Sequence, residues 1–508
     1  MKKLPIGIST LAEIINENYL YVDKTKTALE LIDSGKYYFL SRPRRFGKSL
    51  FLDTLKEIFY GNKELFKGLY IYDKYNFEKH PVINISFGGG EFKSKESWKQ
   101  RISEILTNNI REIGLDLELT KSIAGNFEEL IYQAYKKFNK RVVILVDEYD
   151  KPILDNIENK VVAREIRDEL KGFYSVIKDA DEYLKFVFLT GVSKFSKVNL
   201  FSGLNNLNDI TINQNYATIC GYTQSELEKN FKEHLKNQDL DKIREWYNGY
   251  KWIGESVYNP FDILLFISNN FAYDNYWFST ATPTFLLKMI EVNNYYIPDF
   301  ENIIVNKKIL ESFDVDNIKL ESLMWQTGYL TIAEKIDFFD ELRYKLDIPN
   351  KEVRLSLMNE ISEFLTKISP TEYIDKIKLC LFNRDLESLK TSLISLYSSI
   401  AYNNFTNNKM YEYEGYYVSV FYSYIKALGL DIKNEEPSNK GRIDITVILP
   451  ETIYIMEFKT DGSGALKQIK EKKYYEKFLD SGKEIYLVGI EFDKQEKNIS
   501  KVEYEKAK

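Results

Sequence analysis

The sequence predicts an α/β protein with an N-terminal parallel sheet, a helical middle region and a smaller C-terminal α/β domain. Three observations lead to this prediction. Over roughly the first two hundred residues, short apolar segments alternate with amphipathic helical patterns, which is typical of a parallel sheet. From about Gly221 the pattern becomes helical and rich in aromatic residues. Near the C-terminus, two arms of alternating apolar and polar residues flank Pro450-Glu451, as in an antiparallel hairpin.

Length and composition narrow the classes of function. A chain of 508 residues is too long for one compact domain. The net charge of −6 provides no global basic field for nucleic acid, although a local stripe of Lys and Arg can still hold DNA. The two cysteines and two histidines are too few for a disulfide framework, a thiolate metal cluster, a histidine-based triad or a zinc site; they are Cys220, Cys380, His80 and His234.

The sequence also bears on where the protein acts. Residues Met1–Gly7 carry two lysines but no apolar stretch of the kind found in a signal peptide. No run approaches the roughly 20 apolar residues that a transmembrane helix needs. We therefore expect a cytoplasmic protein without a membrane partner.

The N-terminal sheet is expected to contain four strands, each an apolar run of 5–7 residues, at Tyr37–Ser41, Val82–Phe87, Val142–Val146 and Leu184–Thr190. Amphipathic stretches between them predict helices, for example at Ser49–Tyr60 and Trp98–Ile113. Gly88-Gly89-Gly90 follows a strand without a Lys-Ser pair, so we interpret it as a plain connection.

A basic loop joins the first strand to the first helix and reads Arg42-Pro43-Arg44-Arg45-Phe46-Gly47-Lys48-Ser49. It matches the P-loop pattern at Gly47, Lys48 and Ser49, whereas Arg42 stands where the first glycine is usual. Backbone N–H groups at the start of the helix would cradle phosphates, assisted by the helix dipole. Lys48 would reach the β- and γ-phosphates of ATP, and Ser49 would ligate Mg²⁺.

The same loop carries Arg44 and Arg45, which would add positive charge beside bound phosphates. A glycine at position 42 would permit backbone angles that arginine disfavours. The alternative interpretation is therefore a basic loop that caps an ordinary helix.

Acidic and hydroxyl side chains end the next two apolar strands. Asp147 and Glu148 follow the strand Val142–Val146, at the carboxyl edge where open α/β sheets bind ligands. Asp147 would hold the metal, and Glu148 would orient or deprotonate the attacking water. After the strand Leu184–Thr190, either Thr190 or Ser193 could sense the γ-phosphate; a polar strand end without function is the alternative.

The patterns of apolar and polar residues divide the whole chain into four expected domains. Residues 1–220 are expected to form the phosphate-binding domain, 221–350 a helical lid or winged-helix-like region, 351–410 a helical connector and 411–508 a compact α/β domain. Within the middle region we interpret Trp246–Tyr250 and Tyr258–Pro260 as core and turn elements.

The C-terminal hairpin brings acidic and basic side chains together. If its turn is centred on Pro450 and Glu451, opposed residues have numbers that add up to 901, so Asp444 faces Glu457 at roughly 5 Å. Lys459 lies two residues beyond Glu457 and points to the same side of the sheet. Two carboxylates and an ammonium group suit a Mg²⁺ site for phosphodiester cleavage; a structural Asp–Lys–Glu ion pair is the alternative.

Several motifs in order resemble those of the bacterial AAA-ATPase-like family, which is related to the STAND-type P-loop ATPases. They are Tyr21-Val22-Asp23-Lys24-Thr25, the loop Arg42–Ser49, Val146–Pro152, Thr190–Ser193, Trp246–Tyr250, Tyr258–Pro260 and Gln326–Leu330. Members of this family commonly carry a C-terminal PD-(D/E)xK nuclease-superfamily domain, and residues 411–508 resemble one. Arginine in place of the first P-loop glycine resembles the family's own pattern.

The resemblance implies a P-loop NTPase parallel sheet, a restriction-endonuclease-like C-terminal fold and further site residues. Glu414 best matches a glutamate that the family places on the first helix of the nuclease domain, where it would complete the Mg²⁺ shell of Asp444 and Glu457. Gln468 matches a glutamine on the helix that follows the site. Shortly after the first-helix glutamate the family often has a histidine, and this chain has Val418 there.

Together these observations predict an ATP-binding and ATP-hydrolysing protein that uses Mg²⁺ and cleaves DNA under nucleotide control. Lysines that follow the hairpin could grip a nucleic-acid backbone, with DNA favoured over RNA, or form a solvated helix face; they are Lys467, Lys470, Lys472, Lys473 and Lys477, accompanied by Tyr474 and Tyr475. The alternatives are an ATP-driven switch that self-associates and binds nucleic acid without cutting it, and a degenerate interaction scaffold.

Overall fold

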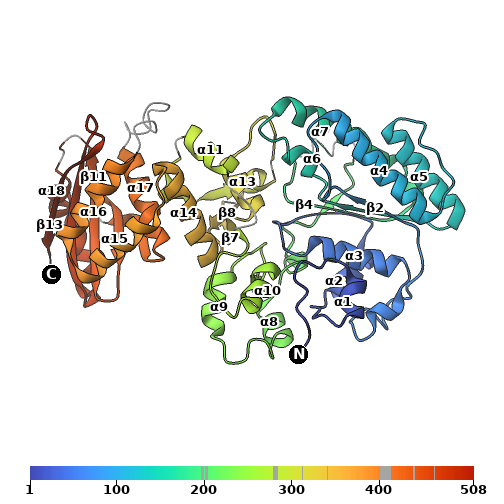
Figure 1. Cartoon of the computed structure of the whole chain (residues 1–508), viewed down its shortest axis with the longest axis horizontal. Helices are drawn as coiled ribbons and strands as arrows, with labels where there is room; N and C mark the ends of the chain where they lie inside the picture. Colours follow the sequence, from blue (N-terminus) through green and yellow to red (C-terminus); the bar gives the residue numbers. More distant parts are fainter. Residues whose placement is uncertain are drawn as a thin grey trace. The chain divides into compact units, whose positions relative to one another are not determined.

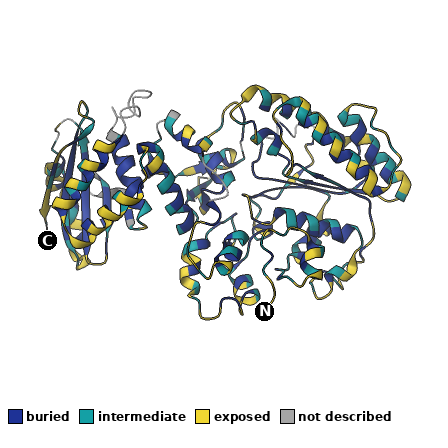
Figure 2. Cartoon of the chain, viewed as in Figure 1, coloured by how far each residue is buried: buried dark blue, intermediate teal, exposed yellow. Residues whose placement is uncertain are grey.

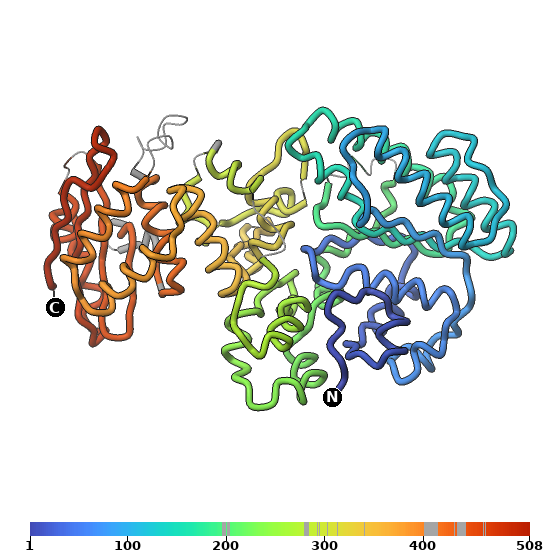
Figure 3. The backbone as a smooth tube through the Cα atoms, viewed as in Figure 1, coloured from blue at the N-terminus to red at the C-terminus, as the bar shows by residue number. Residues whose placement is uncertain are grey.

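The chain folds into two compact units. The computed structural model describes residues 1–195, 200, 204–278, 284–293, 295–301, 303–311, 313–339, 341–400, 414–438, 441–460, 462 and 464–507, with the backbone alone at 292, 414, 431, 434–438 and 441–442. The first unit comprises Met1–Thr280 and Ile304–Asn350, and the second Ala281–Ile303 and Lys351–Lys508. The chain therefore passes between the units three times, a path that can be followed by colour in Figure 3.

A five-stranded parallel sheet organises the first unit, in the order β2-β3-β4-β1-β5. Its strands are β1 (Tyr37–Ser41), β2 (Val82–Ser86), β3 (Val142–Asp147), β4 (Leu184–Gly191) and β5 (Asn208–Asp209). The four predicted strands are confirmed. Because all of them run in the same direction, the phosphate loop, the glycine run and the loops after β3 and β4 meet at one edge of the sheet.

Helices cover both faces of this sheet. Figure 1 shows α1–α3 on one side and α4–α7 on the other. Their bounds are α1 (Leu11–Asn16), α2 (Thr25–Ser34), α3 (Lys48–Phe59), α4 (Lys95–Ile113), α5 (Ile123–Phe138), α6 (Lys151–Leu154) and α7 (Lys160–Asp179). Figure 2 shows the strands as buried and the outer faces of α4, α5 and α7 as exposed, which is the amphipathic pattern seen in the sequence.

The middle region is mainly helical, as predicted, and packs within the first unit except for residues 281–303. Its helices are α8 (Gln224–Asn230), α9 (Leu240–Tyr247), α10 (Pro260–Ser268), α11 (Thr284–Val292), α12 (Lys307–Leu310) and α13 (Leu320–Thr327). It also holds a three-stranded antiparallel sheet whose strands the sequence analysis did not delimit, in the order β6-β8-β7, with bounds β6 (Ile304–Asn306), β7 (Thr331–Phe338) and β8 (Glu341–Asp347).

The core of this region contains the aromatic motifs. Tyr247, Tyr250 and Tyr258 are buried, in agreement with their interpretation as core and turn residues. The division of the chain into four domains stays a prediction.

The second unit contains a five-stranded sheet in the order β13-β12-β11-β10-β9. Its strands are β9 (Asp431–Ser438), β10 (Gly441–Ile448), β11 (Thr452–Thr460), β12 (Glu484–Asp493) and β13 (Asn498–Lys506), and its main helices are α14 (Lys351–Thr366), α15 (Thr371–Asn383), α16 (Leu386–Ser399), α17 (Glu414–Ala427) and α18 (Ala465–Lys472). Helices α14 and α15 pack against α17, and α16 packs against β13.

The register of the predicted hairpin is confirmed. Ile445 pairs with Met456 and Ile448 with Ile453 in an antiparallel ladder, so paired numbers add up to 901. Strand β11 then pairs in parallel with β12. Among the described helices, none is both long and apolar enough to cross a membrane.

Candidate nucleotide and metal sites

The phosphate loop adopts left-handed backbone angles at Arg45, with φ of 68°, and at Gly47, with φ of 91°. Arg42 is not among the residues with positive φ. Arginine in place of the first glycine therefore causes no backbone strain here. Gly47 leads directly into α3, so the free N–H groups of the first helical turn lie beside the loop.

The side chain of Arg42 is a structural support. It is fully buried and donates hydrogen bonds to the carbonyl oxygens of Thr211 at 2.8 Å and Tyr216 at 3.1 Å. Its guanidinium group also lies 4.0 Å from the ring centre of Trp252. Arg42 thus ties the end of β1 to the middle region and leaves the phosphate-binding face of the loop free of its side chain.

Lys48 lies where it can meet a phosphate. Its Nζ atom donates to the carbonyl oxygens of Arg42 and Pro43, both at 2.9 Å. Burial lowers the pKa of Lys48, and the carboxylate of Asp147 opposes this shift. A buried ammonium group forms weaker hydrogen bonds with neutral carbonyl oxygens than with an anion. A bound phosphate would therefore compete favourably for the Lys48 ammonium group.

Asp147 gathers two hydroxyl groups at the edge of the sheet. Its Oδ2 atom accepts a hydrogen bond from the Ser49 hydroxyl at 2.6 Å, and its Oδ1 atom accepts one from Thr190 at 2.7 Å. The start of α3 and the ends of β3 and β4 supply these three side chains. A carboxylate and a serine hydroxyl in contact are oxygen donors of the kind that Mg²⁺ prefers.

Glu148 follows Asp147 in a left-handed conformation with φ of 52°. Burial raises its pKa, and the neighbouring carboxylate of Asp147 raises it further. The glycine run lies beside it: a Cβ atom on Gly88 would be 3.5 Å from Oε2 of Glu148. The sequence predicts a plain connection for this run, and its position at the carboxyl edge after β2 is the signal for its proximity to Glu148.

The structure distinguishes the two hydroxyl candidates near the end of β4. Thr190 contacts Asp147, whereas the Ser193 hydroxyl donates to Asp150 Oδ2 at 2.6 Å and is buried away from Asp147. Thr190 is therefore the better placed of the two for a role at the nucleotide.

The two further loop arginines stay exposed. The carbonyl oxygen of Arg44 accepts a hydrogen bond from the indole of Trp277 at 3.2 Å. The guanidinium group of Arg45 lies 5.0 Å from the ring centre of Phe261. The backbone of Arg44 is held by Trp277, and both arginine side chains lie exposed beside the loop.

The C-terminal hairpin brings its three predicted residues together. Lys459 Nζ lies 3.1 Å from Glu457 Oε1 and 4.0 Å from Asp444 Oδ2. The same Asp444 oxygen accepts a hydrogen bond from the backbone N–H of Phe458 at 2.8 Å, which holds the carboxylate against β11. Asp444 is 24% exposed, and Glu457 is 1% exposed, so one carboxylate faces solvent and the other is buried.

The described residues satisfy the Glu457 carboxylate only in part. Gln468 donates to its Oε1 atom, while Oε2 is buried and has no hydrogen-bond partner in the part of the chain that the structure describes. Burial, followed by the nearby Asp444 carboxylate, raises the pKa of Glu457 to about 7. A buried carboxylate oxygen without a partner is costly, and a divalent cation shared with Asp444 would satisfy it. The residues therefore fit a metal ion.

Comparisons with known proteins identify the families of the two ends of the chain. A family model described as "Predicted AAA-ATPase" matches residues 5–201, and a model of the PD-(D/E)XK nuclease superfamily matches residues 412–502. A relative from Azotobacter chroococcum mcd 1, described as "Uncharacterized protein in vnfD 5'region", is 46% identical over 507 residues, which is 98% of each chain. The chain belongs to the AAA-ATPase-like family. The predicted resemblance is confirmed.

In this AAA-ATPase-like protein, two further residues are candidates for the nuclease-superfamily site, Glu414 and Gln468. Glu414 is the first residue of α17, but its side chain lies outside the described residues. Gln468 lies on α18 and contacts Glu457, as expected from its place after the hairpin. The described residues contain no group of three His, Cys, Asp or Glu side chains arranged to hold a metal ion, so Asp444 and Glu457 are a pair.

Tyr474 is a site residue that sequence reasoning misjudged. It is 2% exposed, so its ring cannot stack on a nucleic-acid base. Its hydroxyl group interacts with Gln468, and the charges of Glu457, Asp444 and Lys459 affect its pKa, which burial raises above its usual value. No helical spacing signals this contact, because α18 ends between Gln468 and Tyr474.

The lysines after the hairpin are exposed, but several are paired with acidic side chains. Lys470 lies 2.6 Å from Glu505, Lys473 lies 3.5 Å from Glu476, and Lys467 lies 3.7 Å from Glu471. Exposed pairs of this kind contribute little stability and exchange readily for a phosphate. They leave both interpretations of this surface open to experiment.

Proposed function

We propose that the protein binds and hydrolyses ATP with Mg²⁺ at the N-terminal site and cleaves DNA with Mg²⁺ at the C-terminal site under nucleotide control. The observation that carries the nuclease half is the buried Oε2 atom of Glu457, beside Asp444 and Lys459, for which the described residues provide no hydrogen-bond partner. A carboxylate kept in this state is expected where a cation completes the site.

The roles in the ATPase half follow from the contacts. Lys48 would exchange its carbonyl partners for the β- and γ-phosphates, and the N–H groups at the start of α3 would hold the phosphate oxygens. Ser49 and Asp147 would hold Mg²⁺, which when bound neutralises charge on the phosphates. Glu148, whose raised pKa marks it as a stronger base than an exposed glutamate, would accept a proton from the attacking water.

A small cavity of about 60 Å³ lies beside the phosphate loop. It is lined mainly by apolar and aromatic side chains next to Gly47, including Leu20, Tyr21, Val22, Phe46, Leu50, Phe51, Cys220, Tyr222 and Pro260. The lining is apolar enough for the edge of a purine base, but a base would enter only if these side chains moved apart. Lys24 and Thr54 also line the cavity, and Lys24 is held there by Glu226 at 2.7 Å.

In the nuclease half, each residue has a separate task. Asp444 and Glu457 would hold Mg²⁺, which when bound polarises the scissile phosphate and lowers the pKa of a coordinated water. Lys459 would position that water and offset the negative charge that develops on the phosphate. Gln468, itself placed by Tyr474, would orient the Glu457 carboxylate.

The test uses the full chain with plasmid DNA, linear DNA and RNA, with and without Mg²⁺ and ATP. We expect DNA cleavage that requires Mg²⁺ and is lost in Asp444→Asn and in Lys459→Met. The matched control is Lys376→Met, which removes an exposed lysine of α15 in the same unit. Cleavage that survives in both site variants would remove the site assignment. ATP turnover without cleavage of any substrate would favour the non-cleaving switch, and absence of nucleotide binding would favour the scaffold.

A further inference from the structure

The phosphate loop leaves its backbone N–H groups unpaired. Among the described residues, the N–H groups of residues 44–50 donate no hydrogen bond. The next N–H group, that of Phe51, donates to the carbonyl oxygen of Gly47 at 3.0 Å. A run of free N–H groups at the start of a helix binds anions. Because these groups form no hydrogen bonds that fix the loop, its shape depends on contacts with other parts of the protein.

The middle region supplies these contacts residue by residue. Each residue from Arg42 to Phe46 meets a residue of the segment 221–350. The pairs are Arg42 with Trp252, Pro43 with Gly328, Arg44 with Trp277, Arg45 with Phe261 and Phe46 with Tyr250. The rings of Phe46 and Tyr250 meet edge to face, with their centres 4.7 Å apart. All of these residues belong to the first unit, so the contacts lie within one compact body.

Trp277 and Gly328 hold the central part of the loop. Trp277 is 1% exposed, and its indole N–H donates to the carbonyl oxygen of Arg44 at 3.2 Å. Gly328 ends α13 in a left-handed conformation with φ of 96°. A Cβ atom at this position would lie 2.9 Å from Cβ of Pro43, closer than two carbon atoms pack. Glycine therefore allows the end of α13 to lie directly against the loop.

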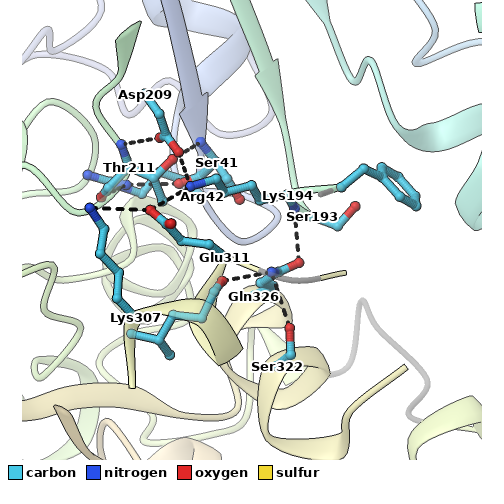
Figure 4. A network of polar contacts seen from close by, with 12 residues as sticks. Ser41, Arg42, Ser193, Lys194, Asp209, Thr211, Lys307, Glu311, Ser322 and Gln326 are labelled. Atoms are coloured by element: carbon cyan, nitrogen blue, oxygen red, sulfur yellow. Dashed lines mark hydrogen bonds and ion pairs between the residues drawn. The ribbon is translucent and has the colours of Figure 1, made fainter. Parts of the chain in front are cut away.

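Gln326 fixes α13 in this place. Its Oε1 atom accepts the backbone N–H of Lys194 at 2.9 Å (Figure 4). Its Nε2 atom donates to the carbonyl oxygen of Leu310 at 3.0 Å. Lys194 follows β4, which pairs in parallel with β1, the strand from which the loop starts. The motif Gln326–Leu330 thus holds α13 to the sheet through its glutamine and meets the loop with its glycine.

We propose that the middle region is part of the nucleotide site, with Trp277 and Gly328 as positioning residues that hold the phosphate loop in its phosphate-binding shape. This role rests on the proposed ATP-binding function and extends the site beyond residues 1–220. A loop that is held before its ligand arrives loses less conformational freedom on binding, so its affinity is higher. The side chains of Arg42, Pro43 and Phe46 provide contacts that glycines in the loop could not.

The substitution Trp277→Phe removes the hydrogen-bond donor and keeps an aromatic ring. In equilibrium titrations of the full chain it should weaken the binding of ATPγS with Mg²⁺ about two- to tenfold, the effect of one hydrogen bond. The matched control is Trp98→Phe. Trp98 lies on α4, is fully buried, and its indole N–H has no hydrogen-bond partner among the described residues. Its replacement should leave the affinity for ATPγS unchanged.

The substitution Gly328→Ala tests the second contact and decides if Trp277→Phe does not fold. It should weaken binding at least as much, because its Cβ atom pushes Pro43 and the loop away. The control is Gly114→Ala, which also changes a left-handed glycine at the end of a helix, α4, with φ of 71°. A Cβ atom there would meet the flexible end of Lys137, 3.1 Å from its Nζ atom. Both alanine variants carry the backbone strain, and Gly328→Ala alone should bind ATPγS more weakly.

Inorganic tripolyphosphate separates a role in the loop from a loss of folding or of base binding. It offers phosphates without a base or ribose, so each loop variant should weaken its binding by the same factor as that of ATPγS. Without ligand, the midpoint of thermal unfolding should fall no further in Trp277→Phe than in Trp98→Phe. A purely structural role would lower this midpoint, and a role at the base would spare tripolyphosphate.

The outcomes separate the positioning role from the function on which it rests. Wild-type affinity for ATPγS in either loop variant that folds would overturn the role. Equal losses of affinity in the controls, or a loss for ATPγS without one for tripolyphosphate, would also overturn it. The same holds if the wild type binds ATPγS but no tripolyphosphate, because the loop is then not preset for phosphates. Failure of the wild type to bind ATPγS would remove the ATP-binding proposal and the positioning role together.

Discussion

The buried carboxylate of Glu457 gives a prediction that does not depend on catalysis. In the metal-free protein its pKa is raised from 4.5 to about 7. For an acid whose pKa is raised by folding, the stabilisation is full below the unfolded pKa and is lost as pH rises through the folded pKa. The metal-free nuclease unit should therefore lose stability between about pH 4.5 and pH 7, by about 3 kcal/mol in total.

The substitution Glu457→Gln removes the titrating group while keeping the size of the side chain. Between pH 5 and pH 8 in EDTA, the wild type should lose about 2–3 kcal/mol more stability than the variant. For a unit of this size that is roughly 5–10 °C in the midpoint of thermal unfolding. Because Glu457 is 1% exposed, solvent screening reduces this value little.

The assay is calorimetric unfolding of the full chain, with hydrogen exchange of β10 and β11 peptides to assign the transition. Saturating Mg²⁺ at pH 8 should restore the wild type, by about 2.7 kcal/mol at one hundred times the dissociation constant, and should leave Glu457→Gln unchanged. Parallel pH curves for the two proteins would refute the reasoning, since Glu457 would then not be the buried titrating carboxylate.

Other predictions concern the N-terminal site. Lys48→Ala should weaken ATP binding at least about tenfold in equilibrium titrations, because a buried phosphate contact is lost; unchanged affinity would remove Lys48 from the site. Glu148→Gln should still bind ATP but turn over about 10²–10⁴ times more slowly, the usual contribution of a general base; full turnover would assign the base elsewhere. Arg42→Met should destabilise the first unit by about 3 kcal/mol or more in thermal unfolding, because it leaves buried carbonyl groups unpaired, whereas exposed Arg244→Met should cost less than about 0.5 kcal/mol. Equal effects of the two would contradict the supporting role of Arg42.

Much of the fold was predictable because local patterns and global structure agree. Apolar strands followed by amphipathic helices predicted the parallel sheet, and the alternation around Pro450-Glu451 predicted the hairpin and its register. The candidate site followed from the register, since opposed and alternate positions in a hairpin have fixed geometry. Asp444, Glu457 and Lys459 could therefore be placed together from the sequence.

Other features depend on contacts between distant segments. The burial of Arg42 against Thr211 and Tyr216 and the position of Gly88 beside Glu148 require the tertiary structure. The contact between Gln326 and Lys194 joins residues 132 positions apart. No local period or spacing encodes such a pairing, so these residues could not be assigned from the sequence.

The central claim is that nucleotide at the N-terminal site controls DNA cleavage at the C-terminal site. The most direct measurement is the rate of plasmid cleavage in Mg²⁺ with ATP, with ADP and without nucleotide, for the wild type and Lys48→Ala. We predict a rate that differs between these nucleotide states in the wild type, is independent of nucleotide in Lys48→Ala, and is abolished by Asp444→Asn. Cleavage at one rate in every nucleotide state of the wild type would contradict the account.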